Sequence, residues 1–477
     1  MKQLGVDASD DEAVRAFAKR VIDRFKRNMT DLVRRYNRDC TIFYNAGHVG
    51  PCTKESAGAY THFELESLPS GSWGYLHFPL TARYARKLGR DCMGMTGKFH
   101  TEWGDFHSLK NLAALEFECF RMLSFGFAIS VGDQLEPNGT LNPATYRLIG
   151  KVYHQVAARE AWARPAVPVT EAAVVTPESP LYEQRIPESV MGAVQMLEEL
   201  ALQFDVIDQE MDLDGYRLVI LPDDLTVSEE FQRKLDRYTA GGGRVIACAK
   251  GGQDADGRYP ACFGAQSEGP RAVYPDFLVA DGVLAEGLEP ENEYVIYLQG
   301  EALAPDGAET LLSARAPYFR REKDFFCSHR YTPSAKGSAY PAVLRRDNVI
   351  LFGHPVFTQY RQNAPYWCKR LMANAIDLLL GGRMIRHDGP STMTVSVLDQ
   401  PGADRTCLHL LTYVPVRKSA TIDIIEERTV LRNVTVRAAI PRKFTQARLV
   451  PENIPLAVKD GAFIIPEING YAIVELK

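Results

Sequence analysis

The sequence predicts an α/β protein that ends in an all-β segment, and three observations support this fold class. Short apolar runs alternate with helical patterns over the first third of the chain. After a proline-punctuated stretch the same alternation begins again and is more regular. Beyond Pro390 only short apolar runs separated by turn residues follow. Alternating strands and helices are typical of parallel sheets, whereas short strands alone are typical of antiparallel sheets.

Length and composition limit the class of protein. A chain of 477 residues with 45% hydrophobic and 24% charged residues is an ordinary globular protein of two to four domains. The net charge of -5 argues against nucleic acid or an anionic membrane as a partner. Nine scattered cysteines without a CxxC pair indicate reduced thiols. The chain has no membrane-length apolar run and its N-terminus lacks a signal-peptide core. We therefore expect a cytoplasmic location.

The first predicted domain covers residues 1–164 and opens with an amphipathic helix over 9–37. Four βα units follow, because compact apolar runs that end in polar or glycine-rich loops are separated in most cases by helical patterns. The predicted strands are 41–47, 61–67, 92–99 and 127–133, and the predicted helices are 79–89, 108–125 and 142–160.

The second predicted domain covers residues 165–388 and begins after the proline-rich linker that follows Arg164. Its alternation of strands and helices indicates a flavodoxin-like α/β fold with an irregular middle. The predicted strands are 204–208, 216–222, 244–249 and 348–357, and the predicted helices are 187–203, 227–239 and 365–380. Residues 389–477 contain only short strand-like runs and predict a small C-terminal antiparallel β-sandwich.

Two loops between residues 60 and 107 combine acidic, histidine and tryptophan side chains. Each of these loops follows a short apolar run, and in parallel α/β folds the loops at the carboxyl ends of strands build the active site. Acids beside aromatic side chains are typical of sugar hydrolases, since carboxylates carry the chemistry and aromatic faces stack on sugar rings. We therefore predict a carbohydrate-binding site that needs no cofactor.

Glu64, Glu66 and Glu102 are the candidate catalytic residues. Glu64 and Glu66 alternate with apolar residues on one strand, so both point to the same face. Glu66 is the best candidate for acid/base work or substrate binding, and the alternative is a buried carboxylate paired with an arginine. Glu102 and Asp105 flank Trp103 on the next loop, and a retaining pair must lie about 5–5.5 Å apart. Capping of the following helix is the alternative for these two acids.

The candidate substrate-binding residues could donate hydrogen bonds to a sugar or stack on it. They are Asn45, His48, His62, Trp73, Tyr75, His100, Trp103, Asp105 and Asp133. Core packing or capping is the alternative for the histidines, packing of the loop for the aromatic residues, and strand termination for Asn45 and Asp133. No HExxH or other i, i+4 ligand pair occurs, so we expect no metal.

Several motifs resemble a known family. The stretches FYNAGHVGP (43–51), HFELESLPSGSWGY (62–75), PLTARYARKLG (79–89), GMTGKFHTEWGDF (94–106) and SVGDQLEPNGTLNPATYRLIG (130–150) resemble the second half of the catalytic (β/α)8 barrel of bacterial α-L-fucosidases of glycoside hydrolase family 151. The stretch YRLVILPDDLTVSEEFQRKLDRYTAGGGRVIA is similar to the β-galactosidase trimerisation domain found there and in family 42.

This resemblance implies a partial, second-half TIM-type barrel, a retaining two-carboxylate hydrolysis of terminal fucosyl residues and a homo-oligomer, preferably a trimer. In that lineage the fourth barrel strand carries an aspartate nucleophile, for which residues 1–40 offer no replacement. We therefore expect a truncated, split or degenerate product with little activity alone. A β-galactosidase-type glycosidase and a non-catalytic sugar-binding or assembly protein are the alternatives.

Overall fold

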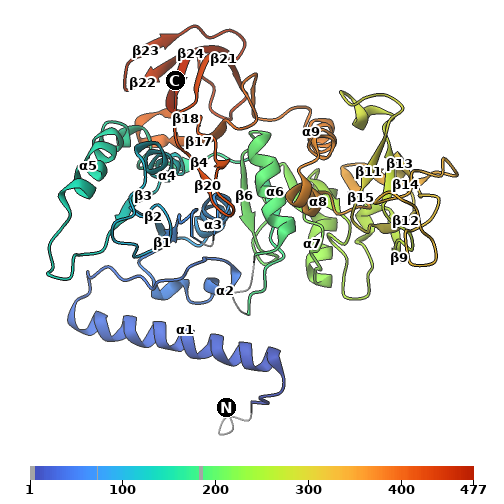
Figure 1. Ribbon diagram of the computed structural model, residues 1–477, viewed down its shortest axis with the longest axis horizontal. Helices are drawn as coiled ribbons and strands as arrows, with labels where there is room; N and C mark the ends of the chain where they lie inside the picture. Colours follow the sequence, from blue (N-terminus) through green and yellow to red (C-terminus); the bar gives the residue numbers. More distant parts are fainter. Residues whose placement is uncertain (1–5, 72, 182–185) are drawn as a thin grey trace. The chain divides into compact units, whose positions relative to one another are not determined.

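The computed structural model describes residues 6–71, 73–181 and 186–477. The chain divides into two compact units (Figure 1). The first unit combines Met1–Val169 and Met384–Lys477 with a short segment that begins at Glu178, and the second combines Thr170–Pro177 with Ile186–Arg383. None of the helices in the described part of the chain has the length and apolar character needed to cross a bilayer.

The first unit begins with the predicted amphipathic helix, α1 (Asp11–Tyr36). Asp10 caps this helix, because its carboxylate accepts hydrogen bonds from the backbone amides of Glu12 and Ala13. On the buried side of the helix, Lys19 Nζ lies 2.6 Å from Asp23 Oδ2.

A parallel sheet follows, with strands β1 (His62–Glu66), β2 (Asp91–Gly97) and β3 (Ala128–Gly132) in that spatial order. Glu66 pairs with Met95, and Met95 pairs with Ser130, so the carboxyl ends of the strands lie together. The connecting helices are α3 (His77–Ala85), α4 (Leu112–Ser124) and α5 (Pro143–Ala157). Phe63 and Leu65 are buried on one face of β1, whereas the opposite face is half-buried.

The strand predicted at 41–47 is wrong. This segment forms no strand, and it bonds to the residue before β1, Thr61, whose amide donates to Ile42 O at 2.9 Å. Tyr44 is directed to α1, where its hydroxyl donates to Lys26 O at 2.7 Å and lies 2.8 Å from Thr30 Oγ1. The short helices α2 (Pro51–Lys54) and Ala57–Ala59 then lead into β1. Within the described residues the parallel sheet therefore has three strands, where the sequence predicted four.

The C-terminal part of the first unit consists of antiparallel sheets, as the short strand-like runs predicted. One sheet contains β16 (Ile385–His387), β21 (Val430–Ala438) and β24 (Ala462–Asn469). The other contains, in spatial order, β23 (Ile454–Leu456), β22 (Ala447–Val450), β25 (Tyr471–Leu476), β18 (Arg405–Leu411), β17 (Thr394–Gln400) and β4 (Val167–Pro168). A small ribbon joins β19 (Val416–Arg417) to β20 (Asp423–Ile424). Strand β4 comes from the proline-rich stretch after Arg164 that the sequence predicted to be an interdomain linker.

Helix α4 links the early and late parts of this unit in one core. The ring of Phe120 stacks on that of Tyr471 with centroids 4.7 Å apart. The buried carboxylate of Glu116 accepts a hydrogen bond of 2.7 Å from Arg428 Nε. The first unit therefore depends on residues that lie more than 300 positions apart in the sequence.

The second unit contains a nine-stranded sheet. Its parallel part has the spatial order β6 (Phe204–Ile207), β5 (Ala172–Val175), β7 (Leu218–Leu221), β8 (Arg244–Cys248) and β15 (Val349–Phe352). Numbered along the chain this order is 2-1-3-4-5, which occurs among doubly wound folds. The helices of this unit are α6 (Glu188–Glu199), α7 (Glu229–Ala240), α8 (Val356–Asn363) and α9 (Tyr366–Leu380).

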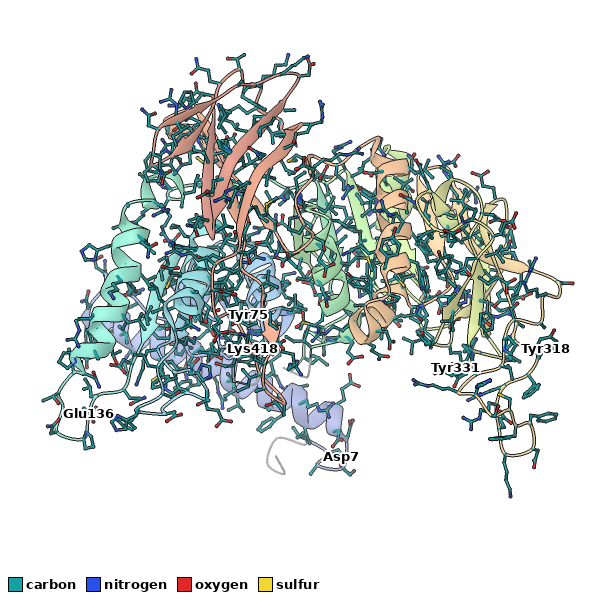
Figure 2. All side chains as sticks on the ribbon, turned by 45° about the horizontal axis from the view of Figure 1, so that its top comes forward. Asp7, Tyr75, Glu136, Tyr318, Tyr331 and Lys418 are labelled. Atoms are coloured by element: carbon teal, nitrogen blue, oxygen red, sulfur yellow. The ribbon has the colours of Figure 1, made fainter. Side chains whose placement is uncertain are left out.

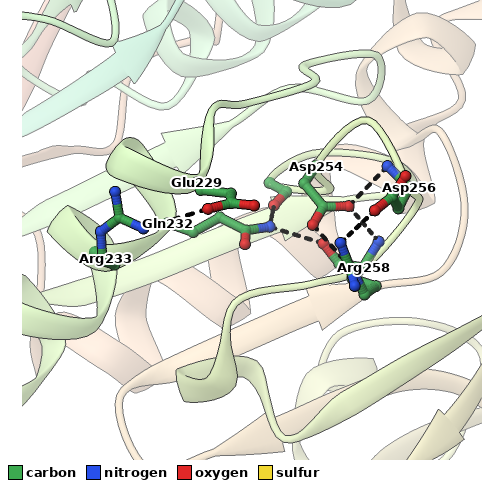
Figure 3. Close-up of polar contacts among 7 residues, drawn as sticks. Glu229, Gln232, Arg233, Asp254, Asp256 and Arg258 are labelled. Atoms are coloured by element: carbon green, nitrogen blue, oxygen red, sulfur yellow. Dashed lines mark hydrogen bonds and ion pairs between the residues drawn. The ribbon is translucent and has the colours of Figure 1, made fainter.

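The middle of the second unit, predicted to be irregular, contains further strands. Four of them extend the sheet beyond β15 with antiparallel pairing: β14 (Tyr340–Arg346), β13 (Glu309–Arg315), β10 (Asp276–Val279) and β11 (Glu293–Ile296). A separate ribbon pairs β9 (Ala265–Pro270) with β12 (Glu301–Pro305). After β8, the Asp254 carboxylate accepts from the amides of Asp256 and Arg258, and Gln232 of α7 bonds to the same turn (Figure 3).

Candidate active site

A cavity of about 530 Å³ lies at the carboxyl ends of β1 and β2 in the first unit. Two acids, Glu66 and Glu102, and two indoles, Trp73 and Trp103, line it together with Lys110. The parallel register explains this grouping, because Glu66 ends β1 directly beside Met95 of β2, and the loop after β2 carries Glu102 and Trp103. Its volume lies within the range of about 300–1,000 Å³ that is usual for small-molecule sites.

The carboxylate of Glu66 is oriented by Trp73. The indole Nε1 donates a hydrogen bond of 2.8 Å to Glu66 Oε2, and the same ring stacks on His77 with centroids 4.2 Å apart. A Cβ at Gly47 would lie 2.9 Å from the Trp73 ring, so a glycine is needed for the close approach of this loop. Glu64 lies on the same face of β1 but outside the cavity lining, and burial together with the charge of Glu66 raises the pKa of Glu64.

Trp103 lies against the backbone at the carboxyl ends of β2 and β3. A Cβ at Gly132 would collide with its indole, and a Cβ at Gly97 would lie 3.2 Å from the same ring. Phe99 supports the indole from the side, with ring centroids 5.2 Å apart. The Trp103 side chain is still 45% exposed, so an aromatic surface is available for stacking on a sugar ring.

Lys110 also lines the cavity and was not among the predicted site residues. Its Nζ donates hydrogen bonds of 2.8 Å to Thr96 Oγ1 and to Glu118 Oε2. Glu118 is fully buried, and burial raises the pKa of its carboxyl group although Lys110 opposes this shift. A glutamate in the middle of the apolar run LAALEFECF was the available signal, because a buried acid needs a cationic partner.

A buried network lies behind Trp73. His48 Nε2 lies 2.6 Å from Glu178 Oε2, and His48 Nδ1 lies 3.1 Å from His77 Nε2. Burial, assisted by the neighbouring His48, lowers the pKa of His77 to about 3. The neutral His77 ring therefore supports Trp73, and through it Glu66.

Other predicted site residues have local partners. Asp105 accepts a hydrogen bond of 2.8 Å from Thr101, and Asp133 lies 3.9 Å from the buried Lys98 ammonium. Thr61 Oγ1 lies 3.0 Å from His62 Nδ1. His100 is half-buried, and Asn45 is exposed.

Tyr75 packs on Phe117, with ring centroids 5.6 Å apart, in the core that α4 shares with the antiparallel sheets. The structure thus brings Glu66, Glu102, Trp73 and Trp103 together at one cavity. The other predicted site residues are not among the described residues that line this cavity: Glu64, Asn45, His48, His62, Tyr75, His100, Asp105 and Asp133. Among the described residues no group of three His, Cys, Asp or Glu side chains is placed to hold a metal ion.

Comparisons with known proteins define the class. The family model of the β-galactosidase trimerisation domain matches residues 186–270. The solved α-L-fucosidase isoenzyme 2 from Paenibacillus thiaminolyticus is 31% identical with a TM-score of 0.94, and the match covers 100% of this chain and 74% of that one. The β-galactosidase from Bacillus circulans sp. alkalophilus has a TM-score of 0.71 at 15% identity, over 98% of this chain and 68% of that one. No curated protein matches the chain in a sequence search.

The protein is thus glycosidase-like, with a fold shared by β-galactosidases and an α-L-fucosidase. The chain belongs to the glycoside hydrolase family that includes the α-L-fucosidase isoenzyme 2 of Paenibacillus thiaminolyticus.

Proposed function

We propose that this protein hydrolyses terminal α-L-fucosyl residues as a member of glycoside hydrolase family 151. The observation that carries the proposal is the cavity at the ends of β1 and β2, where two carboxylates and two indoles meet. The 31% identity over the full chain to an α-L-fucosidase supports the choice of sugar. None of the nine cysteines, all of which lie in the described part of the chain, forms a disulfide, which supports a reducing, cytoplasmic compartment.

We further propose three domains: a second-half (β/α) barrel over residues 1–164, a flavodoxin-like trimerisation domain over 165–388 and a β-sandwich over 389–477. The 2-1-3-4-5 strand order supports the middle assignment.

In the proposed retaining mechanism Glu66 works as acid/base. It protonates the leaving oxygen and later removes a proton from the attacking water. Glu102 is the candidate for the second carboxylate of this site. Trp73 holds the Glu66 carboxylate in one orientation, and Trp103 offers its exposed face to the pyranose ring. Fixing the reacting groups in this way lowers the entropy that must be lost on reaching the transition state.

Assays with aryl α-L-fucosides and aryl β-D-galactosides test the proposal. We expect preferential hydrolysis of the α-L-fucoside, at a rate well below that of the longer α-L-fucosidase that the chain resembles. Glu66→Gln should reduce this turnover further, by about 100-fold or more, while leaving the melting temperature nearly unchanged. Glu136→Gln, in the loop after β3, is the matched control for loss of one carboxylate (Figure 2). Loss of activity in step with loss of folded Glu66→Gln protein would instead indicate a structural carboxylate.

A β-galactosidase-type specificity is the second candidate function, since the trimerisation domain and the fold are shared with β-galactosidases. Preferential cleavage of the β-D-galactoside would favour it. Binding of fucose without cleavage of either glycoside would favour the non-catalytic alternative.

A further inference from the structure

The loop that connects β13 to β14 in the second unit is rich in arginine and aromatic residues. We call residues 317–334 the arginine–aromatic loop. Its base is closed by hydrogen bonds: the amide of Tyr318 donates to Pro333 O at 3.2 Å, and the amide of Ala335 donates to Ala316 O at 3.0 Å. Thr332, which is buried, donates its hydroxyl to Phe319 O at 2.6 Å. The loop therefore has a fixed base from which its outer residues project.

A pocket of about 450 Å³ lies between this loop and two tyrosines from the sheet. Tyr274 precedes β10, and Tyr297 follows β11. The backbone amide of Tyr297 donates to the buried Gln359 Oε1 at 2.9 Å, which holds that wall in place. A second pocket of about 760 Å³ shares Tyr297, Arg330 and Tyr331 with the first. The two pockets thus form adjacent hollows on the same part of the second unit.

Three arginines line the first pocket, and each stacks on an aromatic ring. Arg320 lies 4.3 Å from the Tyr274 ring centroid, Arg321 lies 4.9 Å from that of Phe326, and Arg330 lies 5.1 Å from that of Tyr331. Stacking fixes a guanidinium plane while its N–H edges stay free to bind an oxyanion.

The positive charge of the arginines that line the pocket exceeds the negative charge of the acids near them. Arg320 has Glu322 at 3.6 Å, whereas no carboxylate of the described chain lies within ion-pair distance of Arg321 or Arg330. The segment 318–331 contains four arginines and lysines but only two acids. An anion with two or more oxygens would therefore gain charge-assisted hydrogen bonds at this pocket.

Aromatic surface is also exposed beside these arginines. The side chains of Tyr318, Phe325 and Phe326 are 64%, 60% and 67% exposed. Figure 2 shows Tyr318 and Tyr331 in the same part of the second unit. Large exposed apolar groups that gather at one place commonly mark a binding surface. Aromatic faces suit the apolar faces of sugar rings, and tyrosine hydroxyls can bond sugar hydroxyl groups.

We propose that the arginine–aromatic loop, with Tyr274 and Tyr297, forms a second binding site for an acidic oligosaccharide. Arg321 and Arg330 bind a carboxylate or sulfate group of the sugar, and the aromatic rings contact the neighbouring pyranoses. The choice of a carbohydrate rests on the proposed glycosidase function. The site is separate from the cavity of Glu66, because it is built entirely from residues of the second unit.

Titration calorimetry on the full chain tests this proposal with three probes: a chondroitin sulfate tetrasaccharide, its desulfated form and neutral cellotetraose. We expect binding of the sulfated probe and none of the neutral one. Retained binding of the desulfated probe assigns the anion as a carboxylate, and its loss assigns a sulfate. Arg321→Gln and Arg330→Gln should each weaken binding about tenfold or more.

The matched control is Arg233→Gln on α7, which removes the same charge from the same unit outside both pockets (Figure 3). It should leave binding unchanged, and all three variants should keep the melting temperature and the aryl glycoside hydrolysis of the parent protein. Direct binding does not require catalysis, so a failure of the proposed fucosidase function would be seen separately.

Three results would overturn the proposal. One is equal binding of the neutral and acidic probes. Another is an equal loss of binding in Arg233→Gln, which would indicate attraction to the overall charge. The third is dissociation of an oligomer in Arg321→Gln or Arg330→Gln without an effect on sugar binding, which would make the loop a contact between copies of the chain.

Discussion

The indole Nε1 of Trp73 donates a hydrogen bond of 2.8 Å to Glu66 Oε2. The two residues are only seven positions apart: Glu66 is the last residue of β1, and Trp73 follows in the loop after that strand. Behind the indole, the buried His77 ring lies nearly parallel at an interplanar angle of 12°. The orientation of Glu66 therefore depends on a half-buried loop indole that is itself supported by a buried histidine.

Replacing Trp73 by phenylalanine should keep the aromatic stack on His77 but remove the hydrogen bond to Glu66. A hydrogen bond to a charged group contributes about 1.5–3 kcal/mol, so we expect kcat on the proposed substrate to fall about tenfold or more with little change in the melting temperature. Trp162→Phe is the control, because Trp162 makes a comparable bond of 3.1 Å to Glu475 away from the cavity. An unchanged kcat in Trp73→Phe would mean that this bond does not serve catalysis.

Gly132→Ala should displace Trp103, since the added methyl group would collide with the indole. We expect the KM of the proposed substrate to rise several-fold and the tryptophan fluorescence spectrum to shift. Gly150→Ala in α5 adds the same methyl group where no atom lies within 4 Å, so neither quantity should change there. If both variants behave alike, the contact between Trp103 and the strand ends is not needed for binding.

Lys110→Met should destabilise the first unit strongly. It would leave the buried Glu118 carboxylate without its cation, and breaking a buried ion pair from one side costs about 3–5 kcal/mol. The double variant Lys110→Met with Glu118→Leu should regain most of this loss, as apolar replacements of buried pairs commonly do. The melting temperatures of the two variants test this expectation. A double variant less stable than the single one would show that Lys110 does not stabilise the fold by compensating the Glu118 charge.

Stability should fall as the pH is lowered, partly through His409. Burial lowers the pKa of His409 to about 3, below its usual value near 6.5, so the folded protein resists a proton that the unfolded chain accepts. Its stabilising contribution is therefore present above pH 6.5 and is lost towards pH 3, at up to about 1.4 kcal/mol per pH unit.

The melting temperature of His409→Gln should accordingly fall less between pH 6.5 and 4.5 than that of the parent protein. His154→Gln, at an exposed position, should retain the slope of the parent. If the melting temperature depended on pH equally in all three proteins, His409 would be protonated as readily in the folded protein as in the unfolded chain.

We predict a trimer at micromolar concentration, formed through the trimerisation domain at residues 186–270. Light scattering on the intact chain measures the mass directly, and one chain has a mass of 53.3 kDa. A dimer would favour pairing through an edge of the first unit's parallel sheet, such as β3, since the other edge expected at 41–47 is not a strand. A monomer would contradict both modes of association.

Parts of the fold and the site could be predicted because they depend on neighbours in the sequence. The alternation around Phe63 and Leu65 places Glu64 and Glu66 on one face of β1, as the structure confirms. The joining of Glu66 and Glu102 at one cavity follows from the parallel order of β1 and β2.

Other features depend on residues far away in the chain, which the local pattern does not contain. The segment 41–47 has strand-like composition, but Tyr44 is bonded to Lys26 and Thr30 of α1 and the segment remains unpaired with β1. The short strands between β8 and β15 include AQSEGP, a sequence with little β-propensity that is held by its partner β12.

The shared core of α4 and the C-terminal sheets has a consequence for synthesis on the ribosome. Phe120 cannot be fully buried until Tyr471 has been synthesised. The second unit is encoded between these two residues, so its parallel sheet can form earlier. In a nascent chain synthesised as far as Arg383, the second unit can therefore be folded while the first unit is not. The apolar side of α4 is then exposed and accessible to chaperones. Slowing translation after that point should lengthen the time during which the chain is prone to aggregate.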